Sequence, residues 1–339
     1  MKKTILNTLK FLFFLGAGIF LFWLIYKDQD VTALKKDLSN IHYFWIAISV
    51  LFLTFSHVIR ALRWQMMIKP LGYTSGFLNA FFAVLITYFA NLAIPRLGEV
   101  SRPTILKKYE KIPFGISFGT IVLERIIDVF FLLLLTVFVA LTQGSIILRF
   151  LDNEPFVKEK IQAIINSNFL YYGLLIGVFS LIAAFVFRRY FKESFFYQKL
   201  KELTHKFFEG LRSISKVPNK ALFLFYSFVI WLCYFLMFLF AFYAFDVLDD
   251  IGWIAVLTVF VMGSYGMVAP VQGGIGAWHF MVAGTLIVYG INDQDARVVA
   301  LVVHTLQTLM VVLLGLISTV LLPIVNSKKD EKDIAKSSQ

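Results

Sequence analysis

The sequence has 339 residues, of which 59% are hydrophobic and 16% are charged, with a net charge of +11. Soluble domains carry roughly 25% charged residues, so this composition excludes an ordinary soluble protein and predicts an all-α integral membrane protein. A single cysteine, Cys233, excludes a disulfide framework and a thiolate metal site. We attribute the basic excess to membrane topology and anionic lipid headgroups, and we predict no nucleic-acid binding.

Six uninterrupted apolar runs are long enough to cross a bilayer, which requires roughly 20 residues per helix. They cover residues 5–26, 43–68, 116–141, 169–187, 221–245 and 298–323. The first run is longer than a signal-peptide core and has no clear cleavage site, so we expect the chain to retain it.

Two further apolar regions are interrupted, which brings the number of hydrophobic segments to eight or nine. Residues 77–94 precede the break Pro95-Arg-Leu-Gly-Glu99, and residues 251–290 contain a Pro- and Gly-rich break at 269–276. Both ends of the first region are basic, and both ends of the second are acidic. The positive-inside rule therefore predicts two re-entrant hairpins, one opening to the cytoplasm and one to the outside. The alternative, in which 77–94 spans fully, gives a worse charge pattern.

These segments divide a single transmembrane domain, 1–339, into halves at 5–141 and 169–323. Each half contains two helices, an interrupted hairpin and a third helix, and three crossings per half give the halves opposite orientations. This pattern predicts an inverted repeat of the kind found in transporters. We expect a basic amphipathic cytoplasmic loop at 188–220, a disordered cytoplasmic tail at 326–339, and both termini in the cytoplasm.

Three charged residues, Glu124, Arg125 and Asp128, lie inside the third predicted span. At 1.5 Å per residue, Glu124 is about 12 Å and Asp128 about 18 Å from Ile116, which brackets the bilayer midplane. A charge at this depth costs about 2.5–3.5 kcal/mol, so we expect Arg125 to pair with Asp128, one turn away, or with Glu99. The pair has either a functional role or the structural role of fixing helix register.

The two breaks and the end of the second span supply the other candidate residues. Pro95 and Gly98 free backbone groups that, together with Arg96 and Arg102, can bind a phosphate. Glu99 can pair with an arginine or accept a proton. The alternative is an ordinary basic cytoplasmic loop. The second break permits either a binding turn or close helix packing, and its candidates are Gln272, Gly273, Gly274, Gly276 and His279.

Isolated imidazoles and interfacial residues suggest more limited roles. His279 and His304 lack neighbouring metal ligands, so we predict no metal site and no cofactor. Arg60, Arg63 and Trp64 are expected at the cytoplasmic end of the second span, either contacting lipid headgroups or as snorkelling anchors.

Four motifs occur in a fixed order: Arg60-x-x-Arg63-Trp64, Pro95-Arg96-x-Gly98-Glu99-x-x-Arg102, Glu124-Arg125-x-x-Asp128 and Pro270-x-x-Gly273-Gly274-x-Gly276. In this order they resemble the lysylphosphatidylglycerol synthase transmembrane-region family, also called the flippase-like domain family, over essentially the whole chain. The resemblance implies a bacterial inner-membrane protein related to the part of the multiple-peptide-resistance proteins that moves aminoacylated phospholipids between leaflets. It also implies headgroup-handling roles for Arg96, Glu99, Arg102, Glu124 and Arg125.

The sequence departs from the family pattern at two places. Family members often have a glutamate shortly after the Gly-rich turn, where this chain has Trp278-His279. The synthase members also append a soluble aminoacyl-transfer domain, for which the chain has no room before Gln339, so we do not expect aminoacyl transfer.

We therefore hypothesise a transporter or flippase that moves a phospholipid or lipid-linked substrate, with anionic lipids as partners and a homo-oligomer as a compatible state. An intramembrane transferase acting on a polyprenyl-linked substrate is the enzyme alternative. Such an enzyme would need a pair of carboxylates near the interface. The adjacent pair that we considered is Asp249-Asp250, which is expected in a short external loop. A non-catalytic membrane partner protein is the third hypothesis.

Overall fold

The computed structural model describes residues 41–94, 96–155, 157–159, 162, 204–210, 212–269 and 271–337. The predicted spans at 5–26 and 169–187, and the loop 188–220 as far as residue 203, lie outside the described residues. The labelled elements within the described ranges are all helices, as predicted.

The first group of helices precedes residue 154, and the second follows residue 212. The first comprises α3 (Tyr43–Ile68), η1 (Lys69–Leu71), α4 (Phe77–Ala93), α5 (Leu97–Glu110) and α6 (Phe114–Asn153). The second comprises α10 (Ser213–Lys216), α11 (Lys220–Phe242), η2 (Asp246–Leu248), α12 (Trp253–Val268), η3 (Gln272–Gly274), α13 (Ala277–Val288) and α14 (Asp293–Ser337).

Four of the described helices are long and apolar enough to cross a membrane: α3 extended through η1, α6, α11, and α14 as far as Ser327. α4 and α12 are apolar but shorter, as expected for the arms of interrupted hairpins. On α6, Ile126, Val129 and Phe130 are each more than half exposed. A continuous apolar surface of this kind suits lipid as its solvent, so the protein is an all-α membrane protein.

The first predicted hairpin is present as α4 and α5. The backbone is extended at Ile94 and left-handed at Arg96, with φ of 65°, so the helix breaks there. The end of α5 then returns to the start of α4, where Glu110 Oε1 accepts hydrogen bonds from Gly76 N at 2.8 Å and Asn79 Nδ2 at 2.6 Å. Both ends of the hairpin are therefore at the same end of the molecule.

The second predicted hairpin is present as α12 and α13. Its turn places Gly273, Gly274 and Gly276 at positive φ, between 56° and 81°, where only glycine is unstrained. A Cβ at Gly266 of α12 would lie 2.6 Å from the Cα of Trp278 on α13. The glycines thus serve both roles considered from the sequence, a tight turn and close helix packing.

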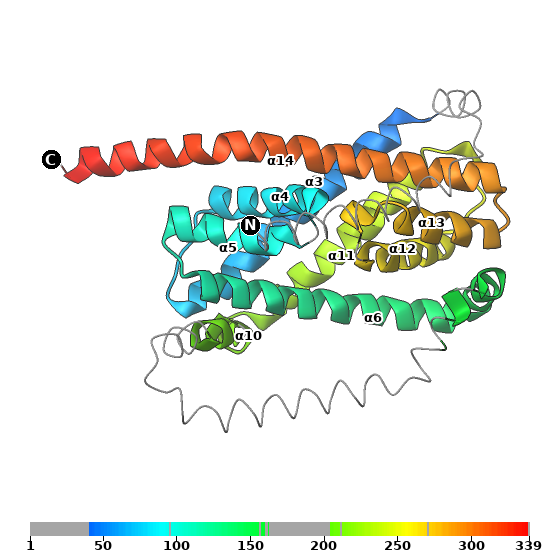
Figure 1. Ribbon diagram of the computed structural model, residues 1–339, viewed down its shortest axis with the longest axis horizontal. Coiled ribbons are helices and arrows are strands. Elements are labelled where there is room, and N and C mark those ends of the chain that lie inside the picture. Colours follow the sequence, from blue (N-terminus) through cyan, green and yellow to red (C-terminus); the bar gives the residue numbers. More distant parts are fainter. Residues whose placement is uncertain are drawn as a thin grey trace, which may run out of the picture.

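The helices of the two groups run in opposite directions. Along α3 and α11, His42 N bonds Ala244 O at 3.1 Å, and Ser49 Oγ bonds Met237 O at 2.8 Å, so the residue numbers rise on one helix as they fall on the other. α6 and α14 also run antiparallel, with the two hairpins between them (Figure 1). Each group thus has the order long helix, hairpin, long helix, which agrees with an inverted repeat. The boundaries 5–141 and 169–323 stay a prediction.

The tips of the two hairpins meet. A Cβ at Gly273 in η3 would lie 2.8 Å from Leu92 Cδ2, near the end of α4. The α4–α5 and α12–α13 hairpins occupy opposite ends of the long axis (Figure 1). The two interruptions of the sequence are therefore neighbours in space.

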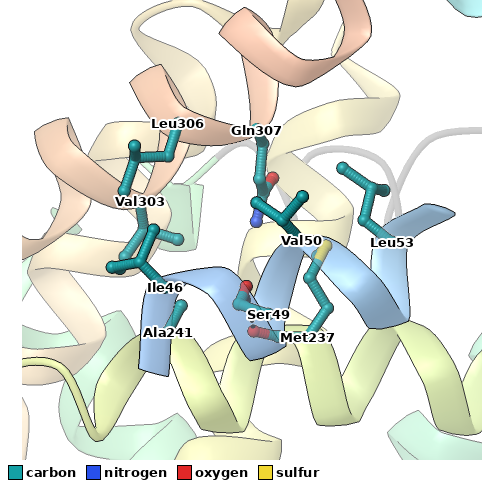
Figure 2. A pocket seen from close by; sticks show the side chains of 9 residues that line it. All are labelled: Ile46, Ser49, Val50, Leu53, Met237, Ala241, Val303, Leu306 and Gln307. Atoms are coloured by element: carbon teal, nitrogen blue, oxygen red, sulfur yellow. Dashed lines mark hydrogen bonds between the residues drawn. The ribbon is translucent and has the colours of Figure 1, made fainter. Parts of the chain in front are cut away.

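Two separate apolar cores hold the two ends of the molecule. One is formed by α3, α4, α5 and α6 around Trp64, and the other by α11, α12, α13 and the beginning of α14 around Trp278. Figure 2 shows a small cavity of about 10 Å³ between α3, α11 and α14, toward which the Gln307 amide points. Its volume suits a single water molecule at most.

Helix α14 extends into the predicted cytoplasmic tail 326–339, whose disorder stays a prediction. The helix continues through Pro323 to Ser337, so residues 326–337 are helical in the structure. Sequence composition alone favours disorder here, because a short charged helix without packing partners is marginal in water.

Candidate functional site

The Glu124 carboxylate of α6 is the centre of a buried charge cluster. Its Oε1 atom contacts the guanidinium groups of three arginines: Arg60 Nη1, Arg102 Nη1 at 3.1 Å and Arg63 Nη2 at 3.6 Å. The Glu124 side chain is fully buried, and none of the three arginines exposes more than 3% of its side chain. Three helices, α3, α5 and α6, therefore meet at one carboxylate.

Asp128 adds a second carboxylate one turn further along α6. Its Oδ2 atom lies 2.9 Å from Arg60 Nη1, and its Oδ1 atom lies 3.1 Å from Arg63 Nη2. The acids are four residues apart on α6 and the arginines three apart on α3, so each pair lies on one helix face. This spacing lets two carboxylates bridge two guanidinium groups across the α3–α6 interface.

Arg125 lies on the outer side of the cluster. Its Nη2 atom is 3.2 Å from Glu99 Oε1 on α5, and its Nη1 atom is 3.9 Å from Asp128 Oδ2. Both partners considered from the sequence are therefore found. Unlike the rest of the cluster, this pair is partly exposed, by 38% at Arg125 and 23% at Glu99.

The cluster carries unequal numbers of positive and negative groups. Among the described residues, four guanidinium groups, Arg60, Arg63, Arg102 and Arg125, face three carboxylates, Glu99, Glu124 and Asp128. With the carboxylates ionised beside these arginines, one positive charge is left over. An added monoanion would neutralise it.

Hydroxyl groups from α4 and α11 extend the cluster. Tyr234 OH accepts hydrogen bonds from Arg60 Nη2 at 3.1 Å and Nε at 3.3 Å, and it lies 3.1 Å from Tyr88 OH. Arg63 Nη1 donates to Ser227 Oγ at 3.0 Å. The sequence analysis missed these three residues because a hydroxyl within an apolar helix is common and gives no signal of its own.

Arg102 has fewer polar partners than the other buried arginines. Its guanidinium stacks over the Trp64 ring at 3.7 Å, and Trp64 Nε1 donates to Thr120 Oγ1 at 2.9 Å. Its Nε and Nη2 atoms are buried without a hydrogen-bond partner among the residues that the structure describes. Buried donors without acceptors are costly, so this side of the cluster favours an added acceptor.

Arg60, Arg63 and Trp64 face the protein interior, with exposures of 2%, 0% and 0%, so their side chains do not project from the surface as snorkelling anchors do. Their position at the membrane interface stays a prediction. Their burial depends on carboxylates about sixty residues later in the chain. The local sequence shows two arginines near a helix end, and it does not show which face of that helix meets α6.

A close α4–α5 contact positions the residues of the first break. Gly98 N donates to Asn91 Oδ1 at 2.7 Å, and a Cβ at Gly98 would overlap the Thr87 carbonyl oxygen. This approach brings Glu99 and Arg102 toward α6. Arg96 is exposed at the tip of the hairpin and belongs to none of the cluster's ion pairs.

The candidates of the second break form a separate group. Gly273 contacts Leu92 and bonds His304 of α14, while Gly274 faces Met267 of α12. The same turn contains Gln272 and Gly276, and His279 follows in the first turn of α13. None of the cluster's ion pairs reaches these residues, so the structure divides the predicted site into a charged part and an uncharged part.

The chain belongs to the lysylphosphatidylglycerol synthase transmembrane-region family, which it matches over residues 7–315. Over 191 residues it is also 31% identical to a UPF0104 membrane protein of Methanocaldococcus jannaschii. That similarity covers 55% of this chain and 54% of the relative, so the chain spans about half the length of the protein it matches. No solved structure matches the chain.

Proposed function

We propose that the protein moves a phospholipid or lipid-linked substrate between the leaflets of the bilayer. The headgroup would bind beside Arg125 and Glu99 while the hydrocarbon chains remain in the membrane. Membership of the transmembrane-region family supports this proposal. Its setting in a bacterial inner membrane, with cytoplasmic termini and anionic lipids as partners, belongs to the same proposal.

The partly exposed Arg125–Glu99 pair carries the argument. Arg125 lies about 16 Å along α6 from Phe114, within the apolar span. The residues around the pair on the same surface, Val100, Ile126 and Val129, are each 47–55% exposed, as lipid-facing residues are. A charged pair on such a surface is costly unless it has a polar ligand or a role, since lipid cannot solvate it.

The charge inequality of the cluster favours function over a purely structural network. A network that only fixed helix register would be expected to balance its charges and bury them together. Here one positive charge is unbalanced, and Arg125 is accessible from the lipid side. A guanidinium group binds phosphate oxygens through a bidentate fork, so a phosphodiester is the ligand group that the cluster suits best.

Roles within the site follow from the ion pairs. Glu124 is already bound by three arginines and holds the site together. Glu99 pairs with Arg125 at 3.2 Å, and Arg125 has only a longer second contact, to Asp128 at 3.9 Å, so among the described residues of the cluster these two can exchange partners most readily. We infer that Arg125 binds the phosphate of the substrate, and that Glu99 is released as its counter-charge.

Lipid exchange in proteoliposomes tests the proposal. The probe is a fluorescently tail-labelled phosphatidylglycerol, whose transfer between leaflets is followed by chemical quenching of the outer leaflet. We expect Arg125→Gln to slow transfer at least tenfold, because the substituted amide cannot form the bidentate phosphate contact.

Arg297→Gln is the matched control. Arg297 pairs with Asp293 at 2.9 Å at the start of α14, away from the cluster. Both variants must elute as the wild type does in size-exclusion chromatography. Transfer by folded Arg125→Gln at the wild-type rate would contradict the proposal and favour a structural role for the cluster.

A further inference from the structure

A pair of imidazoles lies at the tip of the second hairpin, apart from the charged cluster. His279 of α13 and His304 of α14 have ring centroids 4.5 Å apart. Their side chains are buried, with exposures of 1% and 5%. The proposed function makes no use of them.

Hydrogen bonds fix the tautomer of each neutral ring. Gly276 N, which can only donate, bonds His279 Nδ1 at 3.2 Å, so that nitrogen accepts. The Gly273 carbonyl, which can only accept, lies 2.8 Å from His304 Nε2, so that nitrogen carries the proton. His304 Nδ1 is then unprotonated and lies 3.5 Å from Thr308 Oγ1.

The two rings differ in how they would take a second proton. Protonation of His279 at Nδ1 would break its bond with Gly276, which caps the beginning of α13. Protonation of His304 at Nδ1 breaks no bond to the backbone, since the Thr308 hydroxyl can rotate and accept. Two imidazolium rings at this separation repel each other, so the pair binds one added proton, and His304 is its site.

A cavity of about 360 Å³ connects the His304 side chain with the surface of the protein. It is lined by Ile275, His279, Leu301, His304, Thr305, Thr308 and Leu309. Thr305 and Leu309 are exposed, so the cavity opens on the surface of α14. Its lining is mostly apolar, and the imidazoles and the hydroxyls of Thr305 and Thr308 are the polar groups that can bind a water molecule beside His304.

Within the described part of the chain, His279 is the titratable group that faces His304. The neighbouring side chains from other helices are apolar: Leu92 of α4 and Met267 of α12 lie at the glycine turn, Phe150 of α6 lies against Phe280, and Ile46, Val50, Met237 and Ala241 line the small cavity beside Val303. The described residues also contain no group of three potential metal ligands. A proton is therefore the cation that these two rings suit.

We propose that His304 is a protonation site that locks the tip of the second hairpin onto α14. Protonation turns the bond from His304 Nε2 to the Gly273 carbonyl into a charge-assisted one, roughly twice as strong as its neutral form. Gly273 also contacts Leu92, so the lock acts where the two hairpin tips meet. The proton is thus a second ligand of the protein. This assignment does not depend on which lipid, if any, the protein transports.

Nitrogen-15 NMR of histidine-labelled full-length protein in lipid nanodiscs tests the protonation site. Between pH 8 and pH 4.5 we expect one imidazole resonance to titrate that His304→Gln removes and His279→Gln retains. The glutamine amide at position 304 can still donate to Gly273, which favours folding of that variant. A His304 ring that stays neutral over this range, or persistence of that same titrating resonance in His304→Gln, would overturn the assignment, and the resonances of the three other histidines are assigned separately.

Cysteine labelling tests the lock itself. In a Cys233→Ala background, Ile275→Cys reports the hairpin tip, and Val247→Cys in η2, where the native side chain is 41% exposed outside the candidate spans, reports a site away from it. The ratio of their maleimide labelling rates removes the intrinsic pH dependence of thiols. We expect this ratio to be about fivefold lower at pH 5 than at pH 8, and constant in His304→Gln. A ratio independent of pH in the His304 protein would refute the lock even if His304 titrates.

Discussion

The two hairpins have similar shapes and different chemistry. The α4–α5 hairpin places Glu99 and Arg102 of α5 against α6, where ion pairs join it to its neighbours. The α12–α13 hairpin is held by glycines packed against Trp278 and by a histidine bonded to a backbone carbonyl. The comparison teaches that the backbone framework and the charges are separable. One hairpin can hold a charged site while the other keeps the same interrupted geometry without one.

The largest effect is expected where the first hairpin depends on charge. Glu124→Gln leaves three buried arginines without their shared carboxylate. We expect it to lower the free energy of unfolding by about 3–5 kcal/mol, because uncompensated buried charges are costly. Denaturant titration in lipid–detergent bicelles measures this change.

Two further variants make that test selective. Adding Arg102→Met to Glu124→Gln should restore part of the lost stability, since it removes one unpaired charge and keeps an apolar side chain of similar length. Asp293→Asn, in the exposed pair with Arg297, should change stability by less than about 0.5 kcal/mol. Equal losses in Glu124→Gln and Asp293→Asn would show that the first hairpin does not depend on its charges.

A smaller effect is expected where the second hairpin depends on glycine. A Cβ at Gly266 would lie 2.6 Å from the Trp278 backbone, so Gly266→Ala must separate α12 from α13. We expect a loss of about 1–3 kcal/mol, as for other overpacked cores, measured by the same titration. Gly144→Ala is the control, because a Cβ there has nothing within 4 Å. Equal stabilities of the two variants would mean that close packing does not hold this hairpin.

The smallest effect is expected from a neutral polar contact of the second hairpin. Tyr265 OH of α12 lies 2.8 Å from Thr136 Oγ1 of α6 on the exposed side of the helices. Tyr265→Phe should lower the free energy of unfolding by about 0.6 kcal/mol, the average for hydrogen bonds between membrane helices. A loss comparable to that of Glu124→Gln would remove the distinction between the hairpins.

Much of the framework was predictable, because its determinants are local in sequence. The apolar runs and the breaks around Gly98 and Gly273 predict interrupted hairpins, and the cost of an intramembrane charge predicts a partner for Arg125. Glu99 and Asp128 were both foreseen, and both are found.

The rest of the site was not predictable for a physical reason. Whether Arg60 faces lipid headgroups or a carboxylate depends on the rotation of α3 against α6, which distant packing sets. Tyr234 and Ser227 belong to α11, whose sequence gives no sign that it adjoins the cluster. Likewise, the pairing of His279 with His304 joins residues that are isolated in sequence.

Helix α14 contacts both hairpins. It meets the first one where Asn326 bonds Asn79 at 2.7 Å and where Gly315 packs on Phe89, and it meets the second through His304. All three contacts lie on one helix, so a displacement of α14 at one hairpin is passed on to its contacts with the other. The two ends of the molecule are therefore coupled through α14.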